Sequence, residues 1–415
     1  MVVKGFMNQH LPASSNRIEF IDVLRGFTLF GIGIIHMVEQ YFAGPAPQSH
    51  QNFQAHSLGD QIASGIVSVL ISGKFFMIFS FLFGLSFYLQ LKNSDGSLKF
   101  SMRFVWRLVI LFVIGFIHHL HYRGDILTIY AMLGLLLVLA YKLPDKVILV
   151  LGFILMLNVP SAVIRAIDVI QYDPTVKTDP FAGFMGDDHV NEIYFTTLKN
   201  GSYLDILKAN LYEHSFKMKF QVLSGRLYIT AGLFLLGLYV GRKKVLHDIV
   251  LNKSVFKKAI RISLWTLLGC VVFAVAFFGT FALLKKELPM PVQFLAGGFV
   301  MDVFYAAQAL LYGSGLALLF MNEKWQKQLM LFYSVGRMGL TTYLMQTLFG
   351  MLIFFGVGFG LLGDIGALAA IGLSLAFFVF QVYFSKWWFN HFQYGFFEWL
   401  WRSATQMKIQ PLRLP

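Results

Sequence analysis

The side chains of this chain that could do chemistry are the ionisable ones inside its apolar stretches. The stretch FIDVLRGFTLFGIGIIHMVEQYF, within residues 20–43, holds Asp22, Arg25, His36 and Glu39. On a helix, Asp22 and Arg25 can pair at a spacing of three residues. Arg25 and His36 are eleven residues apart, which is three turns plus about 20°, so they share one stripe. A neutral His36 oriented by Glu39 could act as a general base or carry an acyl group. The alternative is a core histidine bonded to a neighbouring carbonyl group.

Lys74 is a second intramembrane candidate, in the stretch ISGKFFMIFSFLFGLSFYLQL. An ionisable side chain costs at least about 2.5 kcal/mol at a helix centre in a bilayer, so it usually has a function there. The predicted depth of Lys74 matches that of His36. Lys74 could bind an anionic substrate group as a point charge or stabilise an oxyanion. Alternatively, it is a structural counter-ion to Glu39 or Asp302.

Three histidines gather where two predicted helices meet, in the string GFIHHLHYRGDILTIYAMLG. His118, His119 and His121 are followed by Arg123 and Asp125. Such a set could bind zinc, but neighbouring helical residues point about 100° apart, and only His118 and His121 meet the usual spacing. We therefore predict no metal. Asp125 is expected to cap the second helix, and His118 or His119 to face an external polar cavity.

The C-terminal half adds Asp302, and it adds Arg337 and Gln346 in the string SVGRMGLTTYLMQTLFG, which also holds Thr341 and Tyr343. Arg337 is near the cytoplasmic end of its predicted span. It could extend to the lipid headgroups, as long basic side chains do, or it could contact the phosphates of a substrate. Asp302 and Gln346 are polar groups inside predicted spans, where such groups mark functional sites.

Apolar helices must position these side chains. The chain has 415 residues, of which 57% are hydrophobic and 13% charged, against roughly 25% charged in soluble domains. This composition excludes a soluble globular fold, and apolar runs of about 18 or more residues predict helices that span a bilayer. We predict an all-α polytopic membrane protein with a single transmembrane domain over residues 1–415. About ten spans are expected, near residues 20–43, 62–90, 104–121, 125–142, 146–167, 224–241, 259–284, 292–320, 329–355 and 365–390.

The formal net charge of +13 follows from topology. About fifteen Lys and Arg lie in the short loops on one side of the predicted bundle and three on the other, which places the first side and both termini in the cytoplasm. Contact with anionic lipid headgroups accounts for the basic residues, so nucleic acid is not an expected partner. Residues 1–19 lack the apolar centre of a cleaved signal peptide.

Residues 168–223 form a connection that is too long and too polar for a simple turn. The orientation rule places this segment outside the cell. Its latter part, LKANLYEHSFKMK, is typical of one or two short amphipathic helices along the membrane interface. The segment is either a spacer or a lid over an external cavity. The single cysteine, Cys270, excludes a disulfide framework within the chain.

Several strings together resemble the YeiB-like family of bacterial multipass membrane proteins, also called domain of unknown function 418. They are IDVLRGFTLFGIGIIHM, GKFFMIFSFLFGLSF, WRLVILFVIGFIHHL with GDILTIYAMLGLL, AGLFLLGLYVGR, VGRMGLTTYLMQT and YGFFEWLWRSATQMKIQPLR, in this order. The family is distantly similar to transmembrane acyltransferases of the acyltransferase-3 and heparan glucosaminide N-acetyltransferase groups. In the acyltransferase-3 group an Arg, ten residues and a His follow one another on the first span, as Arg25 and His36 do here. Many YeiB-like proteins have Asn at the position of His36.

The resemblance implies an acyltransferase of the bacterial inner membrane. The donor would be a cytoplasmic acyl-CoA-type thioester, used as a co-substrate without a permanently bound cofactor, and the acceptor an envelope sugar or lipid. Membrane lipids are the other expected partners, and the oligomeric state is left open. Catalysis is assigned to His36 and Glu39, and substrate binding to Asp22, Arg25, Lys74, His118, His119, Asp125, Asp302, Arg337 and Gln346.

A membrane protein without chemistry is the alternative function. Intramembrane acids and lysines also form ion paths, so a proton-coupled transporter, a flippase or a small-ligand-binding protein would need the same residue types. A purely structural or regulatory membrane protein is a third interpretation. The number of polar residues at matching depths disfavours it, since inert spans need none.

Overall fold

The computed structural model describes residues 18–92, 98–172 and 187–414. Within these ranges the chain is a bundle of α-helices, with one isolated β-bridge between Phe392 and Arg413. The segment before residue 18 and residues 173–186 of the predicted external connection lie outside the described residues.

The bundle is built from helices of very different length, of which the longest have 31 residues. They are α1 (Glu19–Val38), the 3-10 helix η1 (Gln48–His50), α2 (Leu58–Leu70), α3 (Phe75–Lys92), α4 (Leu98–His121), α5 (Leu127–Ala140), α6 (Asp145–Met156), α7 (Val159–Ile170), α9 (Asp188–Asn200), α10 (Tyr203–Tyr212), α11 (His214–Leu223), α12 (Arg226–Arg242), α13 (Lys253–Leu283), α14 (Met290–Phe320), α15 (Glu323–Leu329), α16 (Leu331–Arg337), α17 (Gly339–Phe354), α18 (Ala367–Phe389) and α19 (Phe396–Gln406).

Six helices of the described part are long and apolar enough to cross a membrane, and eight if the bent pairs α6–α7 and α11–α12 each form one span. The prediction of an all-α polytopic membrane protein is therefore confirmed. The predicted number of about ten spans is higher because it includes α5 and α17. These helices have 14 and 16 residues, fewer than the roughly 20 that a straight crossing needs.

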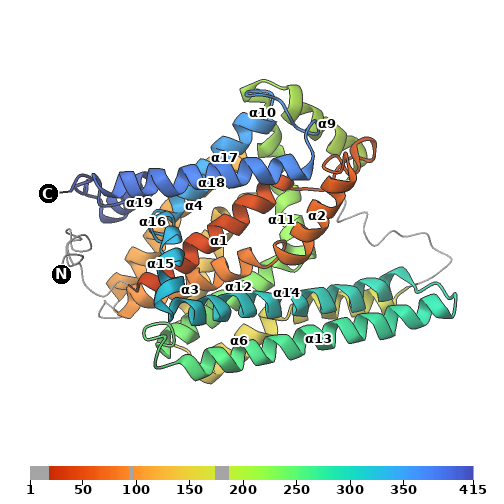
Figure 1. Cartoon of the computed structure of the whole chain (residues 1–415), viewed down its shortest axis with the longest axis horizontal. Coiled ribbons are helices and arrows are strands. Elements are labelled where there is room, and N and C mark those ends of the chain that lie inside the picture. The colour runs from red at the N-terminus through yellow and green to blue at the C-terminus, as the bar shows by residue number, and fades with distance from the viewer. Residues whose placement is uncertain (1–17, 93–97, 173–186, 415) are drawn as a thin grey trace.

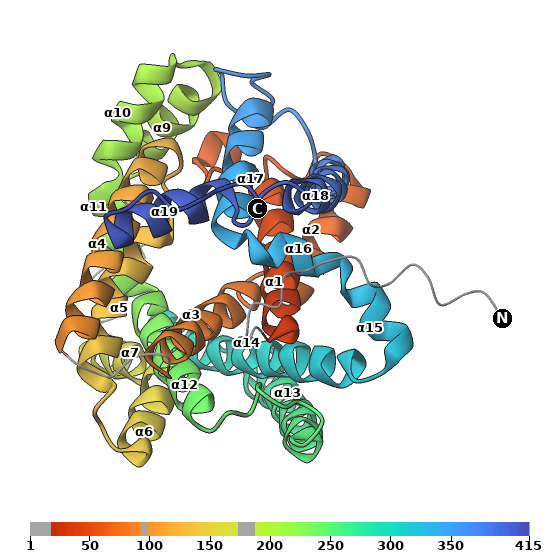
Figure 2. The same ribbon diagram turned by 90° about the vertical axis from the view of Figure 1, so that its left-hand side faces the viewer.

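Helix α1 lies in the middle of the bundle, among α3, α14, α16, α17 and α18 (Figure 2). Its closest neighbour is α16, and the crossing depends on two glycines. A Cβ on Gly26 of α1 would collide with the carbonyl oxygen of Phe332, and one on Gly336 of α16 with the carbonyl oxygen of Asp22. Small residues at such positions let helix backbones approach closely in membranes.

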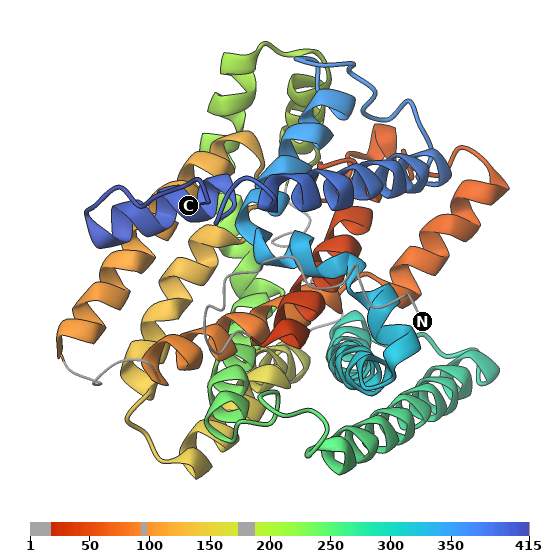
Figure 3. The ribbon, with the colours of Figure 1, turned by 60° about the vertical axis from the view of Figure 1, so that its left-hand side comes forward.

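Helix α13 lies at the edge of the bundle and packs mainly along α14 (Figure 3). Its large apolar side chains are exposed, among them Trp265, Leu268 and Val275. A helix that is apolar all round and exposed suits lipid as its surroundings. The exposed apolar side chains of α13 are thus explained by the bilayer that the sequence predicts.

The first broken span of the bundle, α2–α3, turns at Gly73, which has a φ of +81°. The break frees the last carbonyls of α2, and a backbone carbonyl in an apolar interior needs a donor. Three side chains supply donors. Lys74 Nζ donates to the Ser68 carbonyl oxygen at 2.9 Å. The carbonyl oxygen of Val69 accepts from Gln308 Nε2 at 3.2 Å, and that of Leu70 accepts from Tyr312 Oη at 2.9 Å.

The two ends of the bundle differ in character (Figure 1). One end, on the left in Figure 1, holds the connection after α12, the end of α14, and α19. We call it the basic end. Helices α9, α10 and α2 lie at the other end. Helix α19 runs across the basic end and packs on α4 and α17 (Figure 2).

Candidate functional site

A buried hydrogen-bond network lies where α4 ends and α5 begins. His118 Nδ1 is 2.8 Å from Asp125 Oδ1, and His118 Nε2 is 2.8 Å from Thr347 Oγ1 of α17. Lys217 of α11 donates to Asp125 Oδ2 at 3.1 Å and to Thr128 Oγ1 at 2.8 Å. All five side chains are buried. We call these residues, His118, Asp125, Thr128, Lys217 and Thr347, the His118 network.

The local sequence explains how Asp125 is held. Asp125 comes just before α5, where the first backbone N–H groups of the helix have no partner within the helix. Its carboxylate accepts hydrogen bonds from the N–H groups of Leu127 and Thr128, both at 3.0 Å, and from Thr128 Oγ1 at 2.7 Å. The expected cap on the second helix is present, and the same carboxylate also orients His118.

His36 lies beside this network in a cluster of tyrosines. Its ring centroid is 5.5 Å from that of Tyr41, 5.2 Å from Tyr122 and 6.2 Å from Tyr343. Among the described residues, His36 Nδ1 has no hydrogen-bond partner. The expected hydrogen bond between His36 Nδ1 and Glu39 is not formed, although Glu39, the C-cap residue of α1, keeps helical backbone angles and its N–H bonds to Ile35 O at 2.8 Å.

The predicted external segment supplies part of the site. Helices α9–α11, which we call the outer cap, close over the end of α4. Arg123 is 2% exposed and bonds to Glu213 of the outer cap at 2.9 Å, and Asn210 Nδ2 donates to Leu120 O at 3.0 Å. The outer cap also contributes Lys217, so its described part packs on the bundle and bonds to it, whether the segment acts as a spacer or as a lid.

A capping box begins the middle helix of the outer cap, α10. The hydroxyl of Ser202 accepts from the backbone N–H of Asp205, and the carboxylate of Asp205 accepts from the backbone N–H of Ser202. The side-chain hydrogen bond from Ser202 also lowers the pKa of Asp205. These bonds fix the start of α10, which leads into the turn that carries Glu213.

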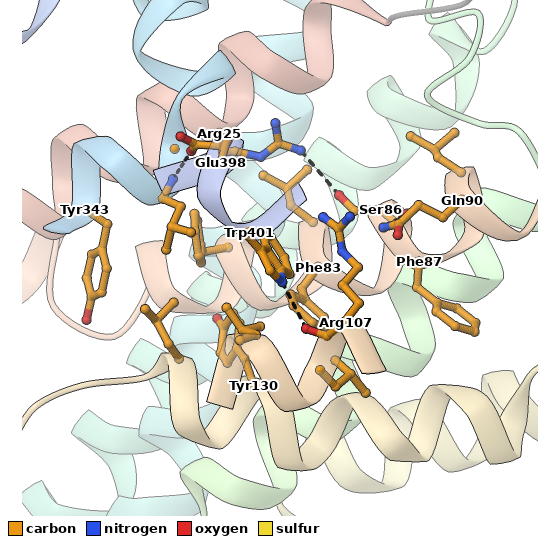
Figure 4. A pocket seen from close by; sticks show the side chains of 18 of the residues that line it. Arg25, Phe83, Ser86, Phe87, Gln90, Arg107, Tyr130, Tyr343, Glu398 and Trp401 are labelled. Carbon is orange, nitrogen blue, oxygen red and sulfur yellow. Dashed lines mark hydrogen bonds between the residues drawn. The ribbon is translucent and has the colours of Figure 1, made fainter. Parts of the chain in front are cut away.

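A cavity of about 430 Å³ lies between α1, α3, α4, α17 and α19 in the basic half of the bundle. Figure 4 shows its lining, with the Arg25 guanidinium pointing toward Ser86 and Trp401 beside Arg107. The deeper wall is apolar, with Phe79, Leu82 and Leu111. Its charged and amide side chains are Arg25, Gln90, Arg107, Arg337, Glu398 and Arg402.

The four arginines of this cavity are held by specific partners. Arg25 Nη1 bonds to Asp22 at 2.7 Å, and Arg25 Nη2 to Ser86 at 3.3 Å. The Arg107 guanidinium stacks on Trp401, 3.8 Å from the ring centroid. Arg337 and Arg402 likewise lie over aromatic rings, of Phe389 at 3.9 Å and Tyr394 at 4.8 Å. The four guanidinium groups are thus held in fixed positions around a cavity that also contains the Glu398 carboxyl group.

Tyr343 connects the cavity to the histidines. It lines the cavity, and its ring centroid is 5.0 Å from that of His118 and 6.2 Å from that of His36. Figure 4 places Tyr343 at the end of the cavity opposite Gln90 and Phe87. Thr347 follows four residues later on α17, about 6 Å along the helix axis, so the His118 network begins one turn beyond the cavity wall.

The remaining predicted site residues lie apart from this centre. Asp302 accepts from Asn158 Nδ2 at 2.8 Å and lies 3.9 Å from Arg165 Nη1. Lys74 is fully buried, 4.2 Å from the ring centroid of Tyr305, and forms no ion pair with a described carboxylate. Lys74 is therefore not the counter-ion of Glu39 or Asp302. It lies in the turn between α2 and α3, and its ammonium group donates to the Ser68 carbonyl oxygen of α2.

Gln346 and His119 each have their own surroundings. Gln346 Nε2 donates to Leu29 O at 3.1 Å and to Gln381 Oε1 at 3.2 Å, and so joins α17 to α1 and α18. His119 is fully buried, with its ring centroid 5.0 Å from that of His214, and neither of its ring nitrogens makes a hydrogen bond with a described residue. His118, rather than His119, takes part in the network.

The sequence reasoning missed several residues of the centre. Lys217 and Thr347 lie in two of the strings quoted above but were not selected as site residues, and only the fold brings Lys217 to Asp125 and Thr347 to His118. Arg107 and Trp401, which stack in the structure, could not be told apart in the sequence from the basic and aromatic residues typical of a membrane interface. A signal was available for Glu398, an acid in the C-terminal string YGFFEWLW, which accepts from the N–H groups of Leu340 and Thr341.

No group of three or more His, Cys, Asp or Glu in the described residues could hold a metal ion. Cys270 is a buried free cysteine. The side chains that converge on the centre are therefore hydrogen-bonding, basic and aromatic groups.

The fold and this centre define a polytopic α-helical membrane protein with a buried histidine–carboxylate network next to an arginine-lined cavity. Residues 240–408 match the family described as "Protein of unknown function (DUF418)", which confirms the resemblance over that part of the chain.

Two bacterial relatives are similar to the chain along nearly its whole length. "Uncharacterized protein YxaH" of Bacillus subtilis (strain 168) is 28% identical, over 98% of each chain. The "Uncharacterized 39.9 kDa protein in amylase 3'region" of Bacillus acidopullulyticus is also 28% identical, over 97% of each chain. No solved structure matches the chain significantly.

Proposed function

We propose that the protein is a membrane acyltransferase that takes an acyl group from a cytoplasmic acyl-CoA-type donor and transfers it to an envelope sugar or lipid. One observation carries this proposal. An arginine-lined cavity in the basic half of the bundle ends at Tyr343, whose other side contacts His36 and His118. A phosphate-bearing donor in this cavity would thus have its acyl end next to the half-buried His36.

The cavity suits such a donor in charge and size. Arg25, Arg107, Arg337 and Arg402 line it, and guanidinium groups bind phosphates in a bidentate way. Its volume of about 430 Å³ is within the range of small-molecule sites. The apolar wall near Leu111 and Tyr343 would hold the thioester arm, while the phosphates remain with the arginines.

His36 is the proposed base for the acceptor. Its unbonded Nδ1 among Tyr41, Tyr122 and Tyr343 leaves a nitrogen that can take a proton. The rings around it fix its orientation, a role that the sequence assigned to Glu39. A positioned base contributes about 10² to 10⁴ in rate.

The test is acyl transfer by purified protein in lipid nanodiscs, with acyl-CoA labelled in the acyl carbon. His36→Ala is expected to lower the turnover at least about 100-fold. His189→Ala, at an exposed position of the outer cap, is the matched control and keeps the wild-type rate. Undiminished turnover in the His36 variant would remove His36 from the mechanism.

A proton-coupled transporter is the second candidate, favoured by the broken helices. Asn158 at the α6–α7 break bonds to Asp302, and a Cβ on Gly225, at the α11–α12 break, would collide with the Asn158 amide. Transporters use breaks of this kind at midplane binding sites. Thermal stabilisation by acetyl-CoA, but by none of a panel of ions and metabolites, would count against transport.

A further inference from the structure

The His118 network contains a hydroxyl, an imidazole and a carboxylate in series. Thr347 Oγ1 is 2.8 Å from His118 Nε2, and His118 Nδ1 is 2.8 Å from Asp125 Oδ1. The three side chains come from α17, the end of α4 and the start of α5. A hydroxyl next to an imidazole that is oriented by a third group is the signature of an activated nucleophile.

The hydrogen bonds of Asp125 determine the direction of this series. The carboxylate already accepts from Lys217, from the Thr128 hydroxyl and from two backbone N–H groups. A carboxylate in that setting can only accept, so His118 Nδ1 carries a proton and donates it to Asp125. When the ring carries only this proton, Nε2 has a free lone pair and accepts from the Thr347 hydroxyl. This is the direction in which a base draws the proton from a nucleophile.

We propose that Thr347 is the acyl-carrying nucleophile of a two-step transfer, with His118 as its base and with Asp125 and Lys217 as positioning residues. This inference rests on the proposed acyltransferase function and specifies its chemistry. Tyr343, which closes the cavity, precedes Thr347 by one helical turn. The thioester carbon of a donor at the cavity end would therefore have to pass only the Tyr343 ring to reach Thr347.

Both steps balance. In the first, Thr347 Oγ1 bonds to the thioester carbonyl carbon, the hydroxyl proton moves to His118 Nε2, and the carbon–sulfur bond breaks. The leaving thiolate takes the proton from the imidazolium and departs as free CoA thiol. In the second step, an acceptor hydroxyl or amine attacks the carbonyl carbon of the threonine ester and gives its proton to His36, the base proposed above for the acceptor. The ester bond breaks and Thr347 Oγ1 regains a proton, so no further reactant is needed.

A neighbouring threonine shows what an inactive hydroxyl looks like in this helix. Thr342 is also buried in α17, but its hydroxyl donates to the carbonyl oxygen of Val335 at 3.1 Å. A carbonyl oxygen holds the hydroxyl proton and cannot remove it. Thr342 is thus the matched control for Thr347.

The experiment is a search for the acyl-enzyme, made in the absence of acceptor. Wild-type protein in nanodiscs is mixed with acetyl-CoA or with p-nitrophenyl acetate, quenched, and analysed by peptide mass spectrometry. An acetyl group on Thr347 is expected, with a burst of free thiol or of p-nitrophenolate approaching one per chain. Thr347→Ser should keep the adduct, Thr347→Val and His118→Ala should lose it, and Thr342→Val should keep it on Thr347.

The outcomes separate this inference from the proposed function. Labelled acyl transfer at the wild-type rate in Thr347→Val, with its thermal stability unchanged, overturns the nucleophile while the acyltransferase stands. A Thr347 adduct from p-nitrophenyl acetate, without reaction of any acyl-CoA, supports the nucleophile and refutes the acyl-CoA donor. Absence of an adduct with both probes overturns the inference. A loss of transfer in Thr347→Val that Thr347→Ser restores shows that the hydroxyl is needed, and the acetyl adduct at position 347 distinguishes a nucleophile from a structural hydrogen bond.

Discussion

Arg107 illustrates, at the scale of single residues, how a basic side chain of the membrane interface becomes part of a site. Its guanidinium lies 3.8 Å from the Trp401 ring centroid, and Trp401 Nε1 donates to the Arg107 carbonyl at 2.9 Å. Stacking holds the charge at the cavity wall while leaving its N–H groups available to a ligand. Arg103, one turn earlier on α4, is exposed.

Arg107→Met is therefore expected to weaken binding of acetyl-CoA at least about 10-fold, because a hydrogen bond to a charged group contributes about 1.5–3 kcal/mol. The measurement is the dissociation constant from isothermal titration in detergent. Arg103→Met is the matched control and keeps the wild-type constant. Equal losses in the two variants would show that only the overall charge of the basic end attracts the donor.

At the scale of elements, two buried ion pairs, Arg123–Glu213 and Lys217–Asp125, join the outer cap to the transmembrane bundle. Arg123 lies among the rings of Phe42 and Tyr194, 4.6 and 3.9 Å from their centroids, and bonds to Glu213 at 2.9 Å. Removal of one partner from a buried pair leaves an uncompensated charge. Since Lys217 follows Glu213 by one turn, the same attachment positions the ammonium group that holds Asp125.

A double-mutant cycle tests this attachment. Arg123→Met is expected to lower the free energy of unfolding by about 3–5 kcal/mol, and the double variant Arg123→Met/Glu213→Gln to recover about 1–3 kcal/mol of it. Unfolding in detergent and hydrogen exchange of α10 and α11 are the measurements. Additive effects of the two substitutions would show that the pair does not hold the outer cap.

At the scale of the whole molecule, the bundle is held by helix crossings too close for side chains. Gly26 and Gly336 form the crossing of α1 with α16, and Gly84 and Gly237 form that of α3 with α12, where a Cβ on either glycine would collide with a carbonyl oxygen. These crossings set the positions of α1, α3 and α16, which form part of the cavity wall. Gly313 of α14, in contrast, has nothing within 4 Å of a built Cβ.

Gly26→Ala is expected to destabilise the protein by about 1–3 kcal/mol, the usual cost of overpacking. Gly313→Ala is the control, with unchanged or slightly higher stability, because Ala has the better helix propensity. The melting temperature in detergent measures both. A neutral Gly26→Ala would mean that α1 and α16 can separate without cost.

The features that were predictable from the sequence depend on local pattern. The apolar runs indicated the helices, the string around Asp125 indicated a helix cap, and the polar residues of α1 and α4 indicated where the centre lies. The pairing of Glu39 with His36 was predicted from helical spacing alone, and His36 Nδ1 has no partner among the described residues although Glu39 keeps helical backbone angles. Helical spacing brings two residues near each other, but the rotamers of the side chains decide whether they bond.

Sequence by itself determined that this is an all-α membrane protein with a small set of intramembrane polar residues, since water and lipid sort side chains by type and period. Only the tertiary structure decided which polar residues meet. Lys217 bonds to Asp125 from 92 residues away along the chain and Thr347 to His118 from 229 residues away, whereas Asp302 bonds to Asn158. The physical reason is that a buried polar group must find a partner in space, and distance along the chain does not indicate where that partner lies.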